Sequence, residues 1–541
     1  MNKYKLFIAL LLFPLMLLAA GNGGSACKFR IYLKDKGATS FSVNNPQEYL
    51  SEKAIERRIR QHIPVDETDL PLSPQYADRI EALGCTVVAK SKWMTTITVH
   101  CDDSATVHNI KALDFVKDAV LVWKGNNPAT KSSKSSKAGK RRTELSGYYG
   151  NAYPQIAIHN GDSLHHAGFK GQGMEIAVLD GGFKGFDAND LLENVRARIK
   201  GRKNFVYIAD SCYEVPHGSN VLSCMATDLP GLYIGTAPEA GYWLLQTENP
   251  ETEYPVEEDY WVAAAEYADS VGVDVINSSL GYSAFNDPLL NYTYAQIDGK
   301  TTYITQGADM AAEKGILVVV SAGNEGSKPW HYVTPPADAE NVLTVGAIQK
   351  DSLIAGFSSR GPTSDLRIKP DVVAVGSQSA LVSWDGDITT GSGTSYASPI
   401  MCGLATCLWQ AFPSLTNKQL RDVLRQSANR SLSPDNNYGY GIPDMIKAME
   451  LAKTETANIS RSSVVNADIK IFSDKAGGLR ITKNTENNGK LSIRIVSIDG
   501  KTLVSDTFCG KEKQYQLNPV KNSLYIVYIR SKDYAVAQKV F

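Results

Sequence analysis

Cysteine is scarce in this sequence, and neither sign of charge prevails. Eight cysteines among 541 residues are too few for a disulfide scaffold. The 56 basic and 57 acidic residues leave a formal charge of −1, so nothing in the bulk charge favours nucleic acid or an anionic membrane as partner. No apolar run reaches the ~20 residues needed to span a bilayer, and no internal repeat is found. The remaining composition is that of a globular protein, and the length predicts about three domains.

The first 26 residues are typical of an export signal. Lys3 and Lys5 precede an apolar run, Leu6–Leu18, and small residues follow it. This order indicates a secretory signal peptide over residues 1–26, so we expect export, through the periplasm to the medium or the cell surface. Cys27 raises lipid attachment after cleavage as a second option. Gly24 stands where lipoprotein signals usually carry a large aliphatic residue, and we therefore favour simple release.

Composition divides the rest of the chain into segments. A mixed pattern of helix and strand predicts an α+β domain over residues 27–125. The basic segment 126–146 cannot bury enough surface to offset the entropy of ordering it, and it is predicted to be a solvated linker. Residues 147–455 form the candidate catalytic segment, and a polar stretch at 456–466 is interpreted as a second linker. Alternating segments in 467–541, with a turn at Asp499-Gly500, predict a small all-β domain, a β-sandwich.

The middle segment alternates apolar strands with helices. Continuous apolar runs are typical of strands that are covered on both faces of a parallel sheet. The alternation predicts an α/β domain with a doubly wound, mainly parallel sheet, and ligands of such sheets bind beyond the carboxyl ends of the strands. The expected strands are Met174–Leu179, Val273–Ile276, Ile316–Val320 and Val342–Ile348, and the expected helices include Glu257–Ser270 and Ile304–Lys314.

Four polar residues stand at these strand ends and helix starts. Asp180 closes one strand, Asn324 follows another, and His217 and Ser395 each open a helix. A serine hydroxyl is a weak nucleophile, so acyl transfer needs a histidine that takes its proton and a carboxylate that orients the histidine. It also needs an amide donor for the oxyanion. The four residues can fill these roles, although spacing alone does not show that they meet.

The motifs around these residues closely resemble those of the subtilisin-like serine peptidases, the subtilases. The Asp, His and Ser motifs occur in the order of that family and cover the whole middle segment. The matching segments are Ile176–Asp180, His217–Asn220, Gly393–Pro399, Ser321–Gly326 for the oxyanion, Ser278–Gly281 for substrate pairing, Pro336-Ala337 before Asn341–Ala347, Phe357–Pro362 and Lys369–Asp371.

The resemblance implies a secreted serine endopeptidase with a subtilisin-like fold. Ser395 would attack the scissile carbonyl, His217 would act as base and then as acid, and Asp180 would orient His217. Asn324 and the backbone N–H of Ser395 would stabilise the oxyanion. An extended peptide substrate would pair with the chain as an added strand. The substrate-binding positions implied by the family are Ser279, Leu280, Gly281, Ala322, Gly323 and Pro336.

The flanking regions also resemble parts of secreted subtilases. Residues 27–125 resemble the propeptides that chaperone and inhibit these enzymes. The resemblance implies that this domain binds the catalytic part of its own chain and that the basic linker is the site cut during maturation. A permanent accessory domain is the alternative. The tail resembles the C-terminal sorting domains of type IX secretion cargo in Bacteroidetes, which would add that machinery as a partner. A β domain without a sorting role is the alternative there.

Other chemistry has little support in the sequence. A Gly-x-Ser-x-Gly elbow, a His-Glu-x-x-His zinc helix and a phosphate loop are all missing, and no cofactor is expected to be required. The acidic cluster Glu248–Glu258 is a candidate structural calcium site, but a solvated acidic face is the preferred interpretation. Cys212 and Cys224 are candidates for pairing, and Cys402 and Cys407 are expected to be buried. The rival function is a catalytically silent peptide-binding module on the same fold.

Overall fold

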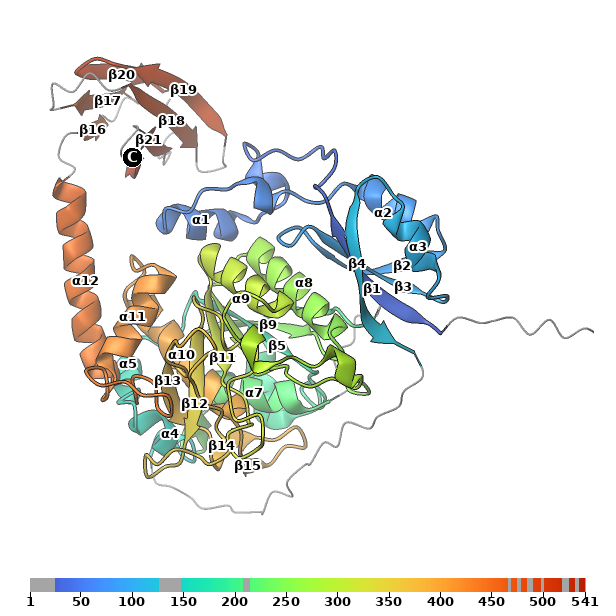
Figure 1. The fold of residues 1–541 in the computed structure, drawn as a ribbon. Coiled ribbons are helices and arrows are strands. Elements are labelled where there is room, and N and C mark those ends of the chain that lie inside the picture. The colour runs from blue at the N-terminus through green and yellow to red at the C-terminus, as the bar shows by residue number, and fades with distance from the viewer. Residues whose placement is uncertain are drawn as a thin grey trace, which may run out of the picture.

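A computed structural model describes residues 25–125, 147–207, 215–465, 469–473, 478–483, 490–497, 501–517, 525–530 and 535–540 of the chain. The apolar part of the expected signal, the basic linker, Cys212 and the Asp499-Gly500 turn lie outside these residues. Figure 1 shows a central α/β domain with an N-terminal domain against it. A strand-rich C-terminal region follows a long helix, α12 (Met445–Val465).

The central domain is built on a seven-stranded parallel sheet, as predicted. The strand order is β13-β12-β11-β10-β5-β9-β6, and every neighbouring pair is parallel. From β5 the chain first adds β6 and β9 on one side and then adds β10 to β13 on the other, as in a doubly wound sheet. The strands are β5 (Glu175–Asp180), β6 (Ile199–Asn204), β9 (Gly241–Gln246), β10 (Val275–Ser278), β11 (Leu317–Ser321), β12 (Leu343–Ile348) and β13 (Val372–Val375).

Helices cover both faces of this sheet, which explains its continuous apolar strands. Along β5, Ile176 and Val178 enter one core with residues of helices α7 (His217–Ala226) and α10 (Thr394–Ala411). Ala177 and Leu179 enter the other core with residues of α8 (Val256–Val271) and α9 (Tyr303–Glu313). Alternate side chains of a strand point to opposite faces, so each face of the sheet has its own helical layer.

Short elements complete the central domain. They are α4 (Tyr153–Ala157), α5 (Asp162–His166), η3 (Asp190–Leu192), α6 (Glu193–Arg196), η4 (Pro288–Leu290), η5 (Tyr294–Gln296), α11 (Asn417–Ser427), the pair β7 (Asp228–Leu229) and β8 (Tyr233–Ile234), and the hairpin β14 (Ser379–Val382) and β15 (Ile388–Gly391). Within the described residues, no helix combines the length and the apolarity that crossing a membrane requires.

The N-terminal domain has an antiparallel sheet of order β2-β3-β1-β4 and its own apolar core. A disulfide joins Cys85 of β2 to Cys101 of β3, which face each other in the register of the two strands. The sequence did not reveal this pairing, since spacing alone cannot assign connectivity. The elements are β1 (Cys27–Leu33), η1 (Pro46–Glu48), α1 (Glu52–Arg60), η2 (Glu67–Asp69), α2 (Pro74–Glu81), β2 (Cys85–Ser91), β3 (Thr96–Cys101), α3 (Thr106–Lys111) and β4 (Val116–Lys124).

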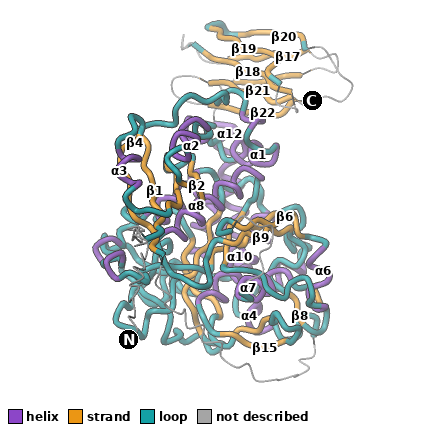
Figure 2. The backbone as a smooth tube through the Cα atoms, turned by 90° about the vertical axis from the view of Figure 1, so that its right-hand side faces the viewer, coloured by secondary structure: helices purple, strands orange, loops and turns teal. Residues whose placement is uncertain are grey.

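The C-terminal region has two antiparallel sheets, of order β16-β17-β20 and β19-β18-β21-β22, with a shared apolar core. The expected linker 456–466 is helical through Val465, because α12 continues into it without a proline or glycine to end it. Figure 2 shows these strands beyond the end of α12. They are β16 (Ile469–Ser473), β17 (Gly478–Lys483), β18 (Leu491–Ser497), β19 (Thr502–Phe508), β20 (Glu512–Gln516), β21 (Tyr525–Arg530) and β22 (Ala535–Val540).

A buried ion cluster ties α11 to the end strand of the central sheet, and it yields a first prediction. Asp371 is fully buried between Lys369, 2.9 Å away, and Arg425 of α11. Replacing it by asparagine leaves the buried Lys369 and the partly buried Arg425 without this anion, so Asp371→Asn should lower the free energy of unfolding by about 3–5 kcal/mol. Chemical unfolding in a Ser395→Ala background measures this. Asp365→Asn is the control, because its pair with Arg367 is partly exposed, and an equal loss in both variants would contradict the assignment.

Candidate active site

The Asp180 carboxylate and the His217 ring meet at the carboxyl edge of the central sheet. Asp180 is the last residue of β5 and is fully buried, whereas His217 is the first residue of α7. The Asp180 Oδ1 atom lies 2.8 Å from the Nδ1 atom of His217 and also accepts the N–H of Gly181. A carboxylate at Nδ1 fixes the tautomer that carries its proton there, so the other ring nitrogen, Nε2, is free to accept a proton.

Ser395 lies in the first turn of α10, beside the end of β10. Its hydroxyl donates to the carbonyl of Ser279 at 3.3 Å, and the Ser279 hydroxyl donates to the carbonyl of Ser395 at 2.9 Å. The ring of the next residue, Tyr396, lies 6.1 Å from the His217 ring, centroid to centroid. The described contacts include no hydrogen bond between Ser395 Oγ and His217, a bond that in unliganded sites often forms only when substrate binds.

Asn324 is oriented by the residue before Ser395. Its Oδ1 atom accepts the N–H of Thr394 at 2.9 Å and the Thr394 hydroxyl at 3.1 Å. The Nδ2 group, a donor, is the remaining end of this amide. The N–H of Ser395 is also available, since the first turn of a helix has no intrahelical acceptor. Both donors lie at Gly393, where a side chain would meet Asn324 Nδ2 at 3.6 Å and the Ser395 N atom at 3.7 Å.

The expected substrate-binding positions line this edge from two loops. No backbone–backbone hydrogen bond among the described residues uses Leu280 or Gly281, which follow β10. A side chain at Gly323 would meet Thr334 Oγ1 at 2.7 Å, and the backbone there is left-handed, with φ of +101°. The Pro335-Pro336 peptide is cis. The backbone of Leu280 and Gly281 is available to pair with an extended peptide next to the serine.

Two carboxylates act on the ionisation of His217. Burial lowers the pKa of this histidine, but the nearby Asp180 charge and hydrogen bond, with a further contribution from Glu248, raise the pKa above its ordinary value overall. Glu248 follows β9 and lies close to Gly181, where an added side chain would meet its Oε2 atom at 3.2 Å. The protonated form of His217 is thus stabilised by the negative charges of two carboxylates, Asp180 and Glu248.

The preferred interpretation of the acidic cluster is wrong for part of it. Glu257 and Glu258 are fully buried instead of solvated, because the N-terminal domain covers the start of α8. Within the described residues, no group of His, Cys, Asp or Glu side chains is arranged to hold a metal ion.

His331, outside the expected mechanism, lies near the Gly326 carbonyl at 2.9 Å. Cys402 and Cys407 are buried as predicted.

Two residues of the site were not identified from the sequence. Thr394 orients Asn324, and its place inside the serine motif was a usable signal. Glu248 follows β9, a strand that was not among the predicted ones although its apolar run Tyr242–Leu245 resembles the others. Once β9 is placed beside β5, its carboxyl end must lie next to Asp180.

Comparison with known proteins agrees with this geometry. The subtilase family model matches residues 171–441, half of the chain, and the model of a peptidase S8 propeptide domain of Bacteroidota matches residues 28–140. The serine protease AprX of Bacillus subtilis (strain 168) is 29% identical over 323 residues, covering 54% of this chain and 68% of the relative. A subtilisin of Bacillus pumilus is 30% identical over 286 residues, covering 52% and 92%. Family model, propeptide model and relatives agree, and the chain belongs to the subtilase family of serine endopeptidases.

Proposed function

We propose that this endopeptidase is exported as a precursor and hydrolyses polypeptides through Asp180, His217 and Ser395. The observation that carries the proposal is the 2.8 Å contact between Asp180 and the Nδ1 atom of His217, beside the helix that presents Ser395. Such a contact leaves Nε2 unprotonated and able to take the proton that a nucleophilic serine must lose. The basic segment Lys131–Arg142, between the propeptide domain and the catalytic domain, is the proposed maturation site.

The first half of the reaction forms an acyl-enzyme. Rotation about the Cα–Cβ bond of Ser395 would take the hydroxyl from the Ser279 carbonyl, where it is held at 3.3 Å, to His217. The hydroxyl oxygen attacks the scissile carbonyl while His217 Nε2 takes its proton. Asp180 stabilises the resulting imidazolium without becoming protonated. His217 then gives the proton to the leaving amine, and the C–N bond breaks.

The second half repeats these steps with water in place of the serine. Water adds to the acyl carbonyl as His217 takes a proton from it, and the Ser395 hydroxyl is released with that proton. In both halves the carbonyl oxygen becomes an anion between Asn324 Nδ2 and the N–H of Ser395. Thr394 holds Asn324 in place beforehand, so little reorganisation is needed when charge develops.

Covalent labelling tests the nucleophile. A fluorophosphonate probe should label the processed protein, and Ser395→Ala should lose all labelling and about 10⁶-fold in turnover, the loss known from a subtilisin. Intact mass and a thermal scan confirm that the variant is folded. If the folded wild-type protein does not label, the silent peptide-binding module gains support and the proposal fails.

The oxyanion donor has a smaller and separable effect. Asn324→Leu should lower kcat about 10²–10³-fold with little change in KM, because the lost donor acts mainly in the transition state; this range is also known from a subtilisin. Steady-state hydrolysis of a chromogenic peptide measures both constants. Asn437→Leu, at an exposed position, is the matched control and should leave both unchanged. A rise in KM alone would assign Asn324 to substrate binding.

The pH dependence tests the two carboxylates around His217. Only neutral His217 accepts a proton, so kcat/KM should rise with pH through a pKa that lies above the ordinary histidine value. Glu248→Gln removes a negative charge that favours the imidazolium, so the midpoint should move to lower pH. Glu251→Gln, at an exposed position of the same loop, is the control. A midpoint that stays in place, or moves upward, would contradict the role of Glu248.

A further inference from the structure

Three of the described cysteines stand side by side on neighbouring strands of the N-terminal sheet. In the strand order β2-β3-β1-β4, β3 lies between β2 and β1. Cys101 of β3 is the register partner of Cys85 on one side and of Cys27 on the other. Cys85 and Cys101 form the disulfide, and Cys27 carries a free thiol. A free thiol therefore lies next to the disulfide, on the side opposite Cys85.

The three cysteine side chains share one buried layer. Residues directly opposite each other in a sheet point to the same face, and all three belong to the core beneath α2 and α3, with at most 6% of their surface exposed. Figure 1 shows these two helices on the side of the sheet away from α8. Arg30 and Thr98, on the other face, contact Asp259 of α8. The sheet itself thus separates the cysteines from the interface with the catalytic domain.

Cys101 lies within bonding range of both neighbours. Its Cα atom is 4.6 Å from that of Cys85. Leu33 donates its N–H to the Thr95 carbonyl at 3.0 Å, and hydrogen-bonded pairs recur at every second residue of an antiparallel ladder, so Cys27 and Cys101 form such a pair. Cα atoms of such a pair are roughly 5.5 Å apart, inside the range of about 4.4–6.8 Å that disulfides span. Cys27 and Cys85, two strands apart, are separated by roughly 9–10 Å and cannot bond directly.

We propose that these three cysteines form an internal thiol–disulfide exchange site. The Cys27 thiolate attacks the sulfur of Cys101, the Cys27–Cys101 bond forms while the Cys85–Cys101 bond breaks, and Cys85 leaves as a thiolate. The proton that Cys27 loses is balanced by the one that Cys85 takes up, so the exchange needs no outside oxidant or reductant. Because β3 lies between the other two strands, Cys27 approaches Cys101 from the side opposite the leaving sulfur, as displacement at sulfur requires.

The two disulfide isomers differ in side-chain geometry and in loop length. Side chains of a hydrogen-bonded pair are farther apart than those of a non-hydrogen-bonded pair. The Cys27–Cys101 bond therefore needs a local shift of β1, which explains why the structure holds the other pair. The Cys27–Cys101 bond closes a much longer loop, and in the chain-entropy model a longer loop restricts the unfolded chain more. Geometry favours the observed pair, and loop length favours the alternative.

Ionisation of Cys27 sets the rate of the exchange. Burial raises the pKa of its thiol, Lys124 of β4 lowers the pKa, and Asp103, which follows β3, raises it; the net pKa lies above the ordinary value. The Cys27 Sγ atom donates to the carbonyl of Ser25 at 3.2 Å, a contact that the attack on Cys101 would break. Only the thiolate attacks a disulfide, so exchange should be slow near neutral pH and faster at alkaline pH.

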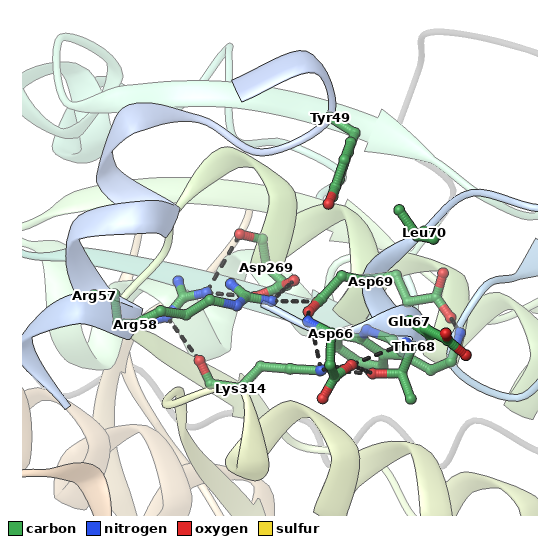
Figure 3. Close-up of polar contacts among 12 residues, drawn as sticks. Tyr49, Arg57, Arg58, Asp66, Glu67, Thr68, Asp69, Leu70, Asp269 and Lys314 are labelled. Atoms are coloured by element: carbon green, nitrogen blue, oxygen red, sulfur yellow. Dashed lines mark hydrogen bonds and ion pairs between the residues drawn. The ribbon is translucent and has the colours of Figure 1, made fainter. Parts of the chain in front are cut away.

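Exchange would move the cross-link to the strand that contacts α8. Arg30 of β1 forms a two-pronged contact with Asp259, at 2.7 and 2.6 Å, whereas β2 is an edge strand. The free Cys27 leaves β1 without a cross-link in the observed isomer, and the exchanged isomer joins β1 to β3. The contact made by α1, where Figure 3 shows Arg57 and Arg58 directed toward Asp269, does not involve this sheet and should be the same in both isomers.

Disulfide mapping of the full chain tests the exchange. Ser395→Ala protein is purified without reductant and incubated at about pH 8.5, near the ordinary pKa of a thiol. Acid stops the exchange, and free thiols are then blocked with N-ethylmaleimide in denaturant before the peptides are mapped by mass. The expected result is a Cys27–Cys101 bond in about 1–10% of the chains, matched by a blocked thiol on Cys85. The same level should be reached more slowly at about pH 7.

Cysteine variants separate exchange within the fold from chance pairing. Cys85→Ser leaves Cys27 beside Cys101, and oxidised glutathione should join these two almost completely. Cys101→Ser is the matched control: it also leaves two thiols, but they stand two strands apart, and no bond between Cys27 and Cys85 should form. Cys27→Ser should keep the Cys85–Cys101 bond and show no blocked thiol on Cys85 at any pH.

Two results would overturn the proposal. One is a Ser395→Ala chain in which Cys85 stays fully bonded, and Cys27 stays free, up to about pH 9, where a large share of ordinary thiols is ionised. The other is equal pairing in Cys85→Ser and Cys101→Ser, or bonds to Cys509, which would show that the thiols pair in unfolded chains. If Cys85→Ser does not fold, the mapping of the Ser395→Ala chain still decides.

Discussion

The parallel register of β9, β5 and β10 is the constraint on which the site depends. Asp180 pairs with Gln246 of β9, and Leu179 pairs with Ser278 of β10, so the chain segments that follow these strands emerge at one edge. Asn324 follows β11 at the same edge, where α7 and α10 also begin. A slip of one residue in any of these pairs would exchange the two faces of that strand, so that side chains packed in one core would enter the other. The packing of both strand faces therefore also fixes the positions of the candidate catalytic groups at this edge.

The sequence predicts this part of the molecule well because each signal is local. Apolar runs mark the strands, Asp180 and Asn324 follow two of these runs, and His217 and Ser395 stand at helix starts. What the sequence did not predict depends on contacts between distant segments. Glu258 is buried because Arg30, far away in the chain, lies against it at 3.7 Å, and no local pattern reports such a partner. The Cys85–Cys101 pair likewise depends on a pairing that spacing leaves undetermined.

Buried charge is used both within one domain and between two domains, with different consequences. Asp371, Lys369 and Arg425 connect parts of one domain. Asp269 with Arg57 and Arg58 connects two domains. Buried pairs gain little over apolar packing, but losing one partner is costly. Across a domain boundary this asymmetry favours a single docked arrangement, since a shifted arginine would leave Asp269 buried without a cation.

The described contacts of α1 with the catalytic domain lie away from the candidate active site. Helices α8 and α9 run antiparallel to the strands they connect, so their C-terminal ends lie away from the edge that carries Ser395. Arg57 of α1 donates to the backbone carbonyls of Val273 and Lys314 at those ends. Among the described residues, these contacts bind the two domains together without entering the edge that carries Ser395. A propeptide held only near the cleft would couple tight binding to inhibition, whereas anchoring at the far edge allows the two to vary independently.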